Sequence, residues 1–324
     1  MAIADKYSQS LIDIVDMRIF IICNSDQLSL PVIHQLQVTG KLSGVGILKK
    51  SAPYLVGPLT SIGVDSSMIH ELNSDQWISD IKKILADINP STVWVLTFPY
   101  MIPDELLNIP IHGWVNFHYG KLPSYKGNDP VFWQIKNMEP TGGLTVHSMT
   151  SKLDEGPVLL SEPVPIAPGE TYGLHCQKLG IIASRYCDTI ISNQQNGKFL
   201  EDIVGHPPGL YEKKPNTADL TIDWSRQSAN EIEALVNATN PKYDGAITSI
   251  NGIPIRLIEV SPADLPIEHE IGPGMVVHAD VVYGIIVSCI ERKFLRINIA
   301  KINEGYASGV RLYSLGISKG AFFK

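Results

Sequence analysis

The stretch MRIFIICNSD, residues 17–26, sets the fold class. Its first seven residues form a compact, mostly apolar run of strand length, and after the turn formers NSD the apolar residues change to helical spacing. Strand-like runs recur at 42–48 and 92–97, with a helical pattern at 77–88 between them. Alternation of this kind predicts an α/β, Rossmann-like domain whose mostly parallel sheet carries helices on both faces.

A further expected strand, 114–118, has polar residues at its carboxyl end. Ligands bind at the carboxyl ends of strands in open parallel sheets, so polar side chains there favour a site. Residues 144–149 are strand-like as well, and 172–193 show one long helical pattern. At its start we interpret His175 and Cys176 as packing residues with no partner in reach.

Composition changes at 205–216, where prolines, glycines and paired lysines replace periodic apolar residues. We expect a linker there, a catalytic domain over 1–204 and a second domain over 217–324. In the second domain a short helix at 228–237, with Ser228 or Asn230 as N-cap, precedes several short strands with turn signals. The strands are expected at 246–250, 253–260, 275–277, 281–289 and 294–299, and they predict a small OB-like β-barrel.

Composition excludes several classes. The formal charge of −7 gives no global attraction to nucleic acid or anionic lipid. The four cysteines lack C-x-x-C spacing, so we expect reduced thiols and no metal site. There is no pattern of a signal peptide, and the longest apolar runs are too short to span a bilayer. We therefore expect a cytoplasmic protein without a membrane partner.

Three residues stand out for chemistry. Asn116 and His118 lie two apart on the expected strand, so their side chains project from one face. A turn-rich loop follows, and Asp154 lies in a later loop between Leu153 and Glu155. Taken singly, each has an ordinary interpretation, because strand histidines usually pack and an aspartate near a glycine usually caps a turn.

In combination, these residues and their neighbours resemble the folate-dependent formyltransferase family, which includes methionyl-tRNA formyltransferases, sugar-nucleotide N-formyltransferases, glycinamide ribonucleotide transformylases and formyltetrahydrofolate hydrolases. The resemblance runs from about Met17 to Lys198 and continues more weakly at TIDWS (221–225), NP (240–241), GA (245–246) and NG (251–252). The motifs that carry it are Asn116-x-His118-x-x-x-Leu122-Pro123-x-Tyr125-Lys126-Gly127-x-x-Pro130-x-x-Trp133, Thr141-Gly142-x-x-Thr145-x-His147-x-Met149 and Asp154-x-Gly156-Pro157.

The resemblance implies transfer of a formyl group from 10-formyltetrahydrofolate, with Asn116, His118 and Asp154 as the catalytic residues. Asn116 would donate an amide hydrogen bond to the developing oxyanion. His118 would act as general base or as a second, charged oxyanion donor, and the sequence leaves both roles open. Asp154 would orient His118 and accept or relay the proton.

The resemblance also implies the cosubstrate contacts. The pterin ring would lie in an apolar slot formed by Phe98, Tyr100, Met101, Ile102 and the loop at Leu153. The loop of Gly120, Lys121, Leu122 and Pro123 matches a folate-contacting segment often written Ser-Leu-Leu-Pro, from which Gly120 and Lys121 depart. We interpret Lys121 as solvated. We interpret His147 and Met149 as buried structural residues and Tyr119, Tyr125 and Trp133 as packing residues.

The formyl acceptor is inferred by exclusion. From 217 onwards the chain has ten basic and twelve acidic residues, and the turn after the first strand lacks the Gly-Thr-Pro typical of the tRNA enzymes. We therefore expect a small-molecule amine, first an amino sugar on a nucleotide, and do not favour tRNA. Methionyl-tRNA, an amino acid or peptide precursor, and water stay open as acceptors, and a nucleic-acid-binding module without activity is the remote alternative. A homodimer is compatible with the sequence.

Overall fold

The computed structural model describes residues 17–200, 211–266 and 271–324. Its backbone contacts divide the chain into two compact units. The sheet unit consists of Met1–Lys126, Gly143–Glu162 and Gln177–Gly209, and the C-terminal unit of Gly127–Gly142, Pro163–Cys176 and Leu210–Lys324. The predicted domains 1–204 and 217–324 remain a prediction, and residues 205–210 of the predicted linker lie outside the described residues.

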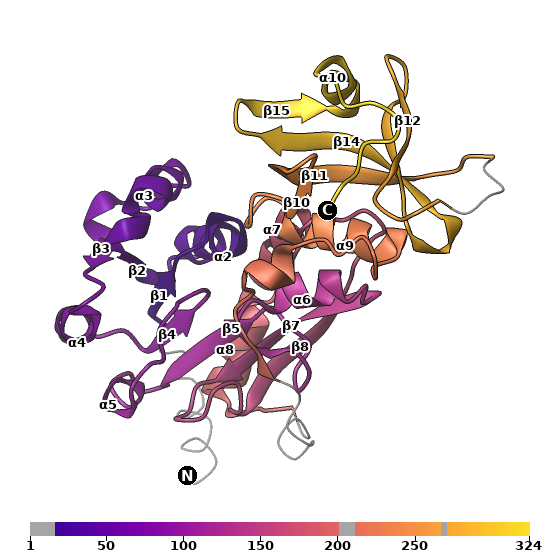
Figure 1. Ribbon diagram of the computed structural model, residues 1–324. Helices are drawn as coiled ribbons and strands as arrows, with labels where there is room; N and C mark the ends of the chain where they lie inside the picture. Colours follow the sequence, from indigo (N-terminus) through magenta and orange to yellow (C-terminus); the bar gives the residue numbers. More distant parts are fainter. Residues whose placement is uncertain (1–16, 201–210, 267–270) are drawn as a thin grey trace, which may run out of the picture. The chain divides into compact units, whose positions relative to one another are not determined.

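A seven-stranded sheet, shown in indigo to magenta in Figure 1, has the order β3-β2-β1-β4-β5-β7-β8. The first five strands in this order pair in parallel, and β7 pairs antiparallel with β5. This confirms the predicted mostly parallel sheet. The strands are β1 (Ile19–Cys23), β2 (Leu42–Leu48), β3 (Ile69–Leu72), β4 (Thr92–Val95), β5 (Trp114–His118), β7 (Thr141–Ser148) and β8 (Val158–Pro165).

Helices connect these strands, and one of them departs from the prediction. The long helix expected at 172–193 is two helices that break at Tyr186, with φ −97° and ψ 4°, a position that neither glycine nor proline marks. The helices are α2 (Asp26–Val38), α3 (Ala52–Ser61), α4 (Trp77–Ile88), α5 (Asp104–Leu107), α6 (Pro130–Lys136), α7 (Tyr172–Arg185) and α8 (Cys187–Gln195), with 3₁₀ turns η1 (Lys49–Ser51) and η2 (Ser66–Met68) and the short strand β6 (Lys126–Gly127).

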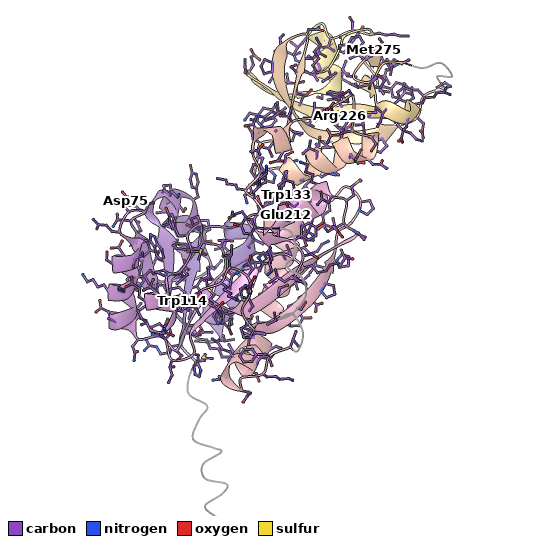
Figure 2. All side chains as sticks on the ribbon, turned by 60° about the horizontal axis from the view of Figure 1, so that its bottom comes forward. Asp75, Trp114, Trp133, Glu212, Arg226 and Met275 are labelled. Atoms are coloured by element: carbon purple, nitrogen blue, oxygen red, sulfur yellow. The ribbon has the colours of Figure 1, made fainter. Side chains whose placement is uncertain are left out.

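The core of the sheet unit explains why the strands read as continuous apolar runs. Every residue of β1 is buried, as expected for a central parallel strand covered on both faces. Phe20 packs flat against β2, where a Cβ on Gly44 would lie 2.9 Å from its ring. Trp114, labelled in Figure 2, is buried and donates its indole N–H to the Leu106 carbonyl at 2.8 Å.

The C-terminal unit contains an antiparallel sheet of order β10-β11-β14-β13-β12, with β15 paired to β14. The C-terminal residues bridge Ile250 to Phe323 and Met275 to Phe322, so they link the β10 edge to the segment before β12. The elements are β9 (Tyr211–Glu212), η3 (Thr217–Leu220), α9 (Ala229–Thr239), β10 (Ala246–Ile250), β11 (Ile253–Ala263), β12 (Val276–Asp280), β13 (Gly284–Ser288), η4 (Ile290–Arg292), β14 (Phe294–Ile302), β15 (Gly305–Ser308) and α10 (Gly309–Ser314).

Side-chain hydrogen bonds determine where one helix and one strand of this unit begin. Ser228 is the N-cap of α9, and it forms a capping box with Glu231. The strand expected at 281–289 starts only at Gly284, because the Asp280 carboxylate accepts hydrogen bonds from the backbone N–H groups of Val282 and Tyr283 and holds a turn there. Across the described parts of the chain, no helix combines the length and apolarity that crossing a bilayer needs.

Candidate active site

The sheet reverses its strand order between β1 and β4, which is the place where open α/β sheets bind ligands. The turn after β1 is held there by Asn24. Its backbone N–H donates to Thr97 Oγ1 at 2.8 Å, and its Oδ1 accepts from Ser51 Oγ at 3.1 Å. Asn24 therefore ties together the carboxyl ends of β1, β2 and β4, one strand away from β5.

Asn116 and His118 lie at the carboxyl end of β5. In the antiparallel pair with β7, Asn116 is opposite His147 and His118 is opposite Thr145. His118 is buried and Asn116 is half-buried. Phe117, between them, turns to the other face, where its ring lies 5.2 Å from that of Trp94. The two polar side chains thus share one face of the sheet.

Asp154 reaches the same place from the loop after β7. The residue has φ +52°, in the left-handed region that disfavours non-glycine residues. The loop presses closely on β7, since a Cβ on Gly156 would lie 1.6 Å from the Ser148 carbonyl oxygen. As a result Oδ1 of Asp154 lies 3.7 Å from Nδ1 of His118 and 3.6 Å from Nε2 of His147.

His118 has a defined tautomer. Its Nε2 lies 2.8 Å from the Tyr125 carbonyl oxygen, which only accepts, so Nε2 carries the proton. Burial lowers the pKa of His118 below its usual 6.5, with His147 adding to that effect and Asp154 opposing it. The imidazole is therefore neutral at pH 7, and its unprotonated Nδ1 faces Asp154.

His147 belongs to this cluster, which the sequence alone did not indicate. It is buried, as predicted, but Nε2 lies 3.2 Å from Nδ2 of Asn116 as well as 3.6 Å from Asp154. In the sequence, His147 is part of the Thr141-Gly142-x-x-Thr145-x-His147-x-Met149 motif and lies on an expected strand two residues before Met149. That signal points to the site only once the antiparallel register of β5 and β7 is known.

Several residues predicted to form the pterin slot contribute to one apolar cluster. Phe98 and Tyr100 pack edge to face at 5.4 Å, and Trp77 stacks on Tyr100 at 5.6 Å. Met149, two residues after His147, packs against the same buried cluster, which also contains Ile102. At the loops, Met101 and Leu153 are 63% and 43% exposed. Apolar side chains of this kind are what a pterin ring would pack against, and their contact with the cosubstrate stays a prediction.

The predicted folate loop is fixed to β7 through Thr145. The Thr145 hydroxyl donates to the Gly120 carbonyl at 2.8 Å and accepts from the Leu122 N–H at 3.3 Å. The Leu122–Pro123 peptide bond is cis. Lys121 is exposed while its backbone passes Gly143, where a Cβ would lie 3.2 Å from its Cα. The loop therefore presents backbone groups of Gly120 to Pro123 near the carboxyl end of β5.

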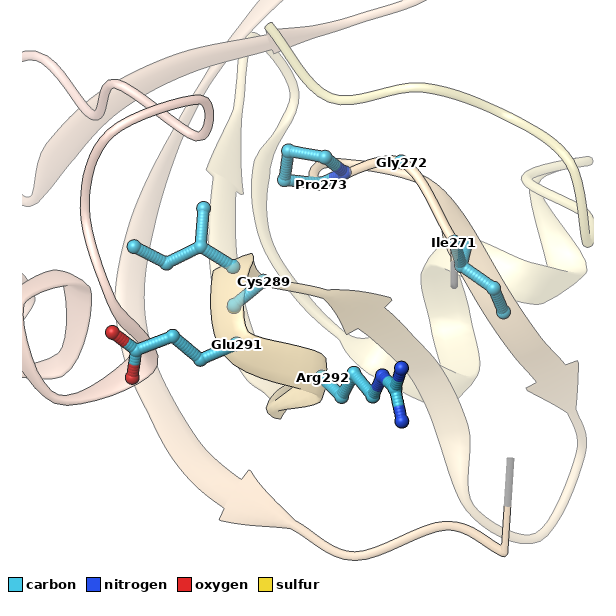
Figure 3. A pocket seen from close by; sticks show the side chains of 7 residues that line it. Ile271, Gly272, Pro273, Cys289, Glu291 and Arg292 are labelled. Carbon is cyan, nitrogen blue, oxygen red and sulfur yellow. The ribbon is translucent and has the colours of Figure 1, made fainter. Parts of the chain in front are cut away.

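The C-terminal unit has a hollow of about 510 Å³ (Figure 3). Glu291 and Arg292 at its wall point in opposite directions, and burial raises the pKa of the Cys289 thiol to about 12, so that thiol is no nucleophile at neutral pH. Nowhere in the described residues do three or more histidine, cysteine or acidic side chains converge as metal ligands would. The acid–histidine cluster on β5 and β7 is the candidate for catalysis.

Both parts of the chain match known family models. Residues 60–180 match the family model described as formyl transferase, and residues 214–313 match that of the formyl transferase C-terminal domain. The methionyl-tRNA formyltransferase of Geobacter metallireducens is 32% identical over 63% of this chain and 64% of its own length, a little under two thirds. That of Marinobacter nauticus is 30% identical over 70% of this chain and 71% of its own length.

Solved structures share the fold. HypX from Aquifex aeolicus, in complex with tetrahydrofolic acid, matches with a TM-score of 0.63 at 15% identity, over 94% of this chain and 48% of that chain. WlaRD, a sugar 3N-formyl transferase with dTDP and 5-N-formyl-THF, matches with a TM-score of 0.57 at 17% identity, over 86% of this chain and 96% of that chain.

The sequence relatives do not support the expectation against tRNA, because both are named for methionyl-tRNA. The expectation rested on the net charge of the chain, which is a poor guide to binding of tRNA. Net charge sums a whole surface, whereas contacts to phosphates need only a few local cations.

Proposed function

This chain belongs to the formyl transferase family, and from that premise we propose that it moves the formyl group of 10-formyltetrahydrofolate onto a primary amine. The observation that carries the proposal is the convergence of Asn116, His118 and Asp154 at the carboxyl end of β5. The cosubstrate supplies the activated formyl carbon, and the apolar surface of Phe98, Tyr100 and Met149 supports its pterin ring.

The bond changes define what the protein has to do. A bond forms between the acceptor nitrogen and the formyl carbon, the bond from that carbon to N10 of the folate breaks, and a proton passes from the amine to N10. Negative charge develops meanwhile on the formyl oxygen. Asn116 Nδ2–H is the donor for that oxygen, and such a donor is worth about 3 kcal/mol. The Nε2–H of His118 donates to the Tyr125 carbonyl oxygen at 2.8 Å, which fixes the orientation of the imidazole.

The proton is handled on the other side of the same imidazole. Because His118 is neutral with its proton on Nε2, its Nδ1 is the basic nitrogen, and Asp154 Oδ1 at 3.7 Å stabilises the positive charge that protonation creates. The proton then leaves to the departing nitrogen. His118 thus acts as the base at Nδ1, and Asp154 orients it.

The acceptor that we propose first is an amino sugar attached to a nucleotide. It is supported by the turn after β1, which lacks the Gly-Thr-Pro typical of the tRNA enzymes, and by the fold shared with a sugar 3N-formyl transferase. The second candidate is methionyl-tRNA, which the names of the sequence relatives favour.

The deciding experiment incubates the protein with 10-formyltetrahydrofolate and separate acceptors. The acceptors are nucleotide-linked amino sugars, hydroxyornithine and other amino acids, methionyl-tRNA, and water alone. We expect one amine to gain the mass of a formyl group, with tetrahydrofolate formed in equal amount. Formate without a formylated amine would show a hydrolase, and no consumption of the donor with any acceptor would overturn the proposal.

Matched variants tie the activity to the site. We expect the Asn116→Ala, His118→Ala double variant to lose activity by at least about 10³-fold, because the oxyanion donor and the base are both removed. His34→Ala is the control, since His34 is an exposed histidine on α2. Full activity in the double variant would contradict the assigned site.

A further inference from the structure

We propose that His147 is a positioning residue that acts on formyl transfer through the amide of Asn116. The inference rests on the proposed function and adds a fourth residue to its site. His147 is 2% exposed and lies directly opposite Asn116 in the β5–β7 pair. In the proposed reaction His118 already accounts for proton transfer. We therefore assign a different role to His147.

The hydrogen bonds of His147 fix its tautomer. Nδ1 lies 3.0 Å from the Ser148 carbonyl oxygen, which only accepts, so Nδ1 carries the proton of the neutral ring. Nε2 is then a pure acceptor. It lies 3.2 Å from Nδ2 of Asn116, an atom that only donates, so the amide N–H donates to the imidazole.

This bond decides which way the Asn116 amide faces. A flipped amide would place Oδ1 against the lone pair of Nε2, and two acceptors in contact repel each other. In the observed orientation one N–H of Nδ2 is held by His147, and the second N–H remains for the formyl oxygen. Electrostatic catalysis depends on donors that are aligned before the charge develops, so an amide held in one orientation contributes more than one that rotates.

Asp154 separates the tasks of the two histidines. Its Oδ1 lies 3.6 Å from Nε2 of His147 and 3.7 Å from Nδ1 of His118. A proton on His147 Nε2 would turn that nitrogen into a donor and break its bond to Asn116. A proton on His118 Nδ1 disturbs no bond to Asn116. The geometry therefore assigns proton transfer to His118 and orientation of the amide to His147.

The test compares three substitutions of His147 in the full chain, with donor consumption and product formation as readouts. His147→Gln keeps an acceptor at the required length, His147→Asn is one methylene too short, and His147→Leu removes the acceptor. We expect the Leu and Asn variants to lose kcat by about 10- to 100-fold with KM for the folate changed less than about 2-fold, and the Gln variant to stay within about 3-fold of wild type. If the Leu variant fails to fold, the Gln and Asn pair decides.

A double-mutant cycle shows whether His147 acts through Asn116. In an Asn116→Ala background, His147→Leu should change kcat by less than about 2-fold, because the group that it positions is gone. Equal losses in both backgrounds would overturn the proposal, as would a Gln variant as impaired as the Leu variant.

A second readout does not depend on activity. The ¹⁵N resonances of the His147 ring should report the Nδ1–H tautomer in wild type. The opposite tautomer would overturn the proposal even in an active enzyme. If no acceptor is formylated while the tautomer is as expected, the proposed function fails and the catalytic role of His147 fails with it, whereas the contact to Asn116 stands.

Discussion

Two buried contacts between a carboxylate and a histidine differ in the distance between the carboxylate oxygen and the imidazole nitrogen. In the C-terminal unit, Glu170 Oε1 lies 2.7 Å from His175 Nδ1, with side chains 5% and 0% exposed. In the sheet unit, Asp154 Oδ1 lies 3.7 Å from His118 Nδ1, with side chains 4% and 5% exposed. Burial is the same, but only the first pair is within hydrogen-bonding distance.

The closed pair has the surroundings of a structural contact. The second oxygen of Glu170 accepts from the Ala167 N–H at 2.9 Å, so one oxygen binds the first turn of α7 and the other binds the loop before it. His175 packs on Gly142, where a Cβ would lie 3.0 Å from Nε2. The open pair instead leaves His118 Nδ1 unprotonated beside a carboxylate. We infer that the hydrogen-bonded contact of Glu170 and His175 stabilises the fold. The longer contact of Asp154 and His118 leaves the unprotonated Nδ1 of His118 able to accept a proton.

The largest expected effect is on activity, from Asp154→Asn. The substitution keeps the shape and removes the charge that stabilises a protonated His118, so kcat/KM should fall by about 10³-fold. The melting temperature should change by less than about 3 °C, since the slack contact contributes little to stability. Steady-state kinetics and calorimetry measure both. An activity loss below about tenfold would show that the Asp154 carboxylate does not stabilise a protonated His118.

Glu170→Gln should have the opposite profile. Removing one partner of a closed buried pair costs about 3 kcal/mol of unfolding free energy, measured by urea denaturation. Activity per folded molecule should stay within about 2-fold of wild type, because Glu170 lies in neither the predicted pterin slot nor the catalytic cluster. Glu105→Gln is the matched control: its pair with Lys82 is exposed, so we expect a change below about 1 kcal/mol. Equal effects of the two substitutions would remove the distinction between closed and exposed pairs.

The pH dependence of stability isolates His118. Its pKa is lowered in the folded state, mainly by burial, so below the usual value of 6.5 the unfolded chain binds the proton more readily. Unfolding free energy should therefore rise with pH up to about 6.5 and level off above it. His118→Asn should flatten part of that rise. The remaining slope includes His70, whose pKa burial also lowers. An unchanged slope in the variant would show that His118 is not neutral in the folded protein.

Much of the fold was predictable because the spacing of apolar residues indicates where the helices and strands lie. The bounds predicted for β2, α4 and β5 agree with the structure, since each is an apolar run or stripe ended by turn or polar residues. The break at Tyr186 was not predictable, because the apolar pattern continues across it. The interpretation of His175 as a residue without a partner was wrong, because Glu170 lies five positions earlier in a loop whose path the sequence does not define.

The residues of the candidate site could be proposed from the sequence, but their contacts could not. Same-face spacing placed Asn116 and His118 together, whereas the neighbours of Asp154 depend on the left-handed turn at that residue and on the close approach at Gly156. His147 was missed because the register of β5 and β7 is a property of the folded sheet. The acceptor, the cytoplasmic location and the homodimer remain predictions.

The smallest expected effect concerns Cys176, which can report how tightly the Glu170–His175 contact holds the first turn of α7. The thiol is 1% exposed and follows His175 directly, so in wild type it should react with a thiol reagent only when that turn opens. Glu170→Gln should raise its labelling rate by roughly tenfold, because loss of the closed contact makes local opening easier. Asp154→Asn should leave the rate unchanged. Cys23 is the internal control, since burial raises its pKa to about 12 and it lies on β1, in the sheet unit. Mass spectrometry of the labelled peptides separates the two thiols. If Cys23 and Cys176 accelerate together in Glu170→Gln, opening is global and the closed pair stabilises the whole protein rather than the start of one helix.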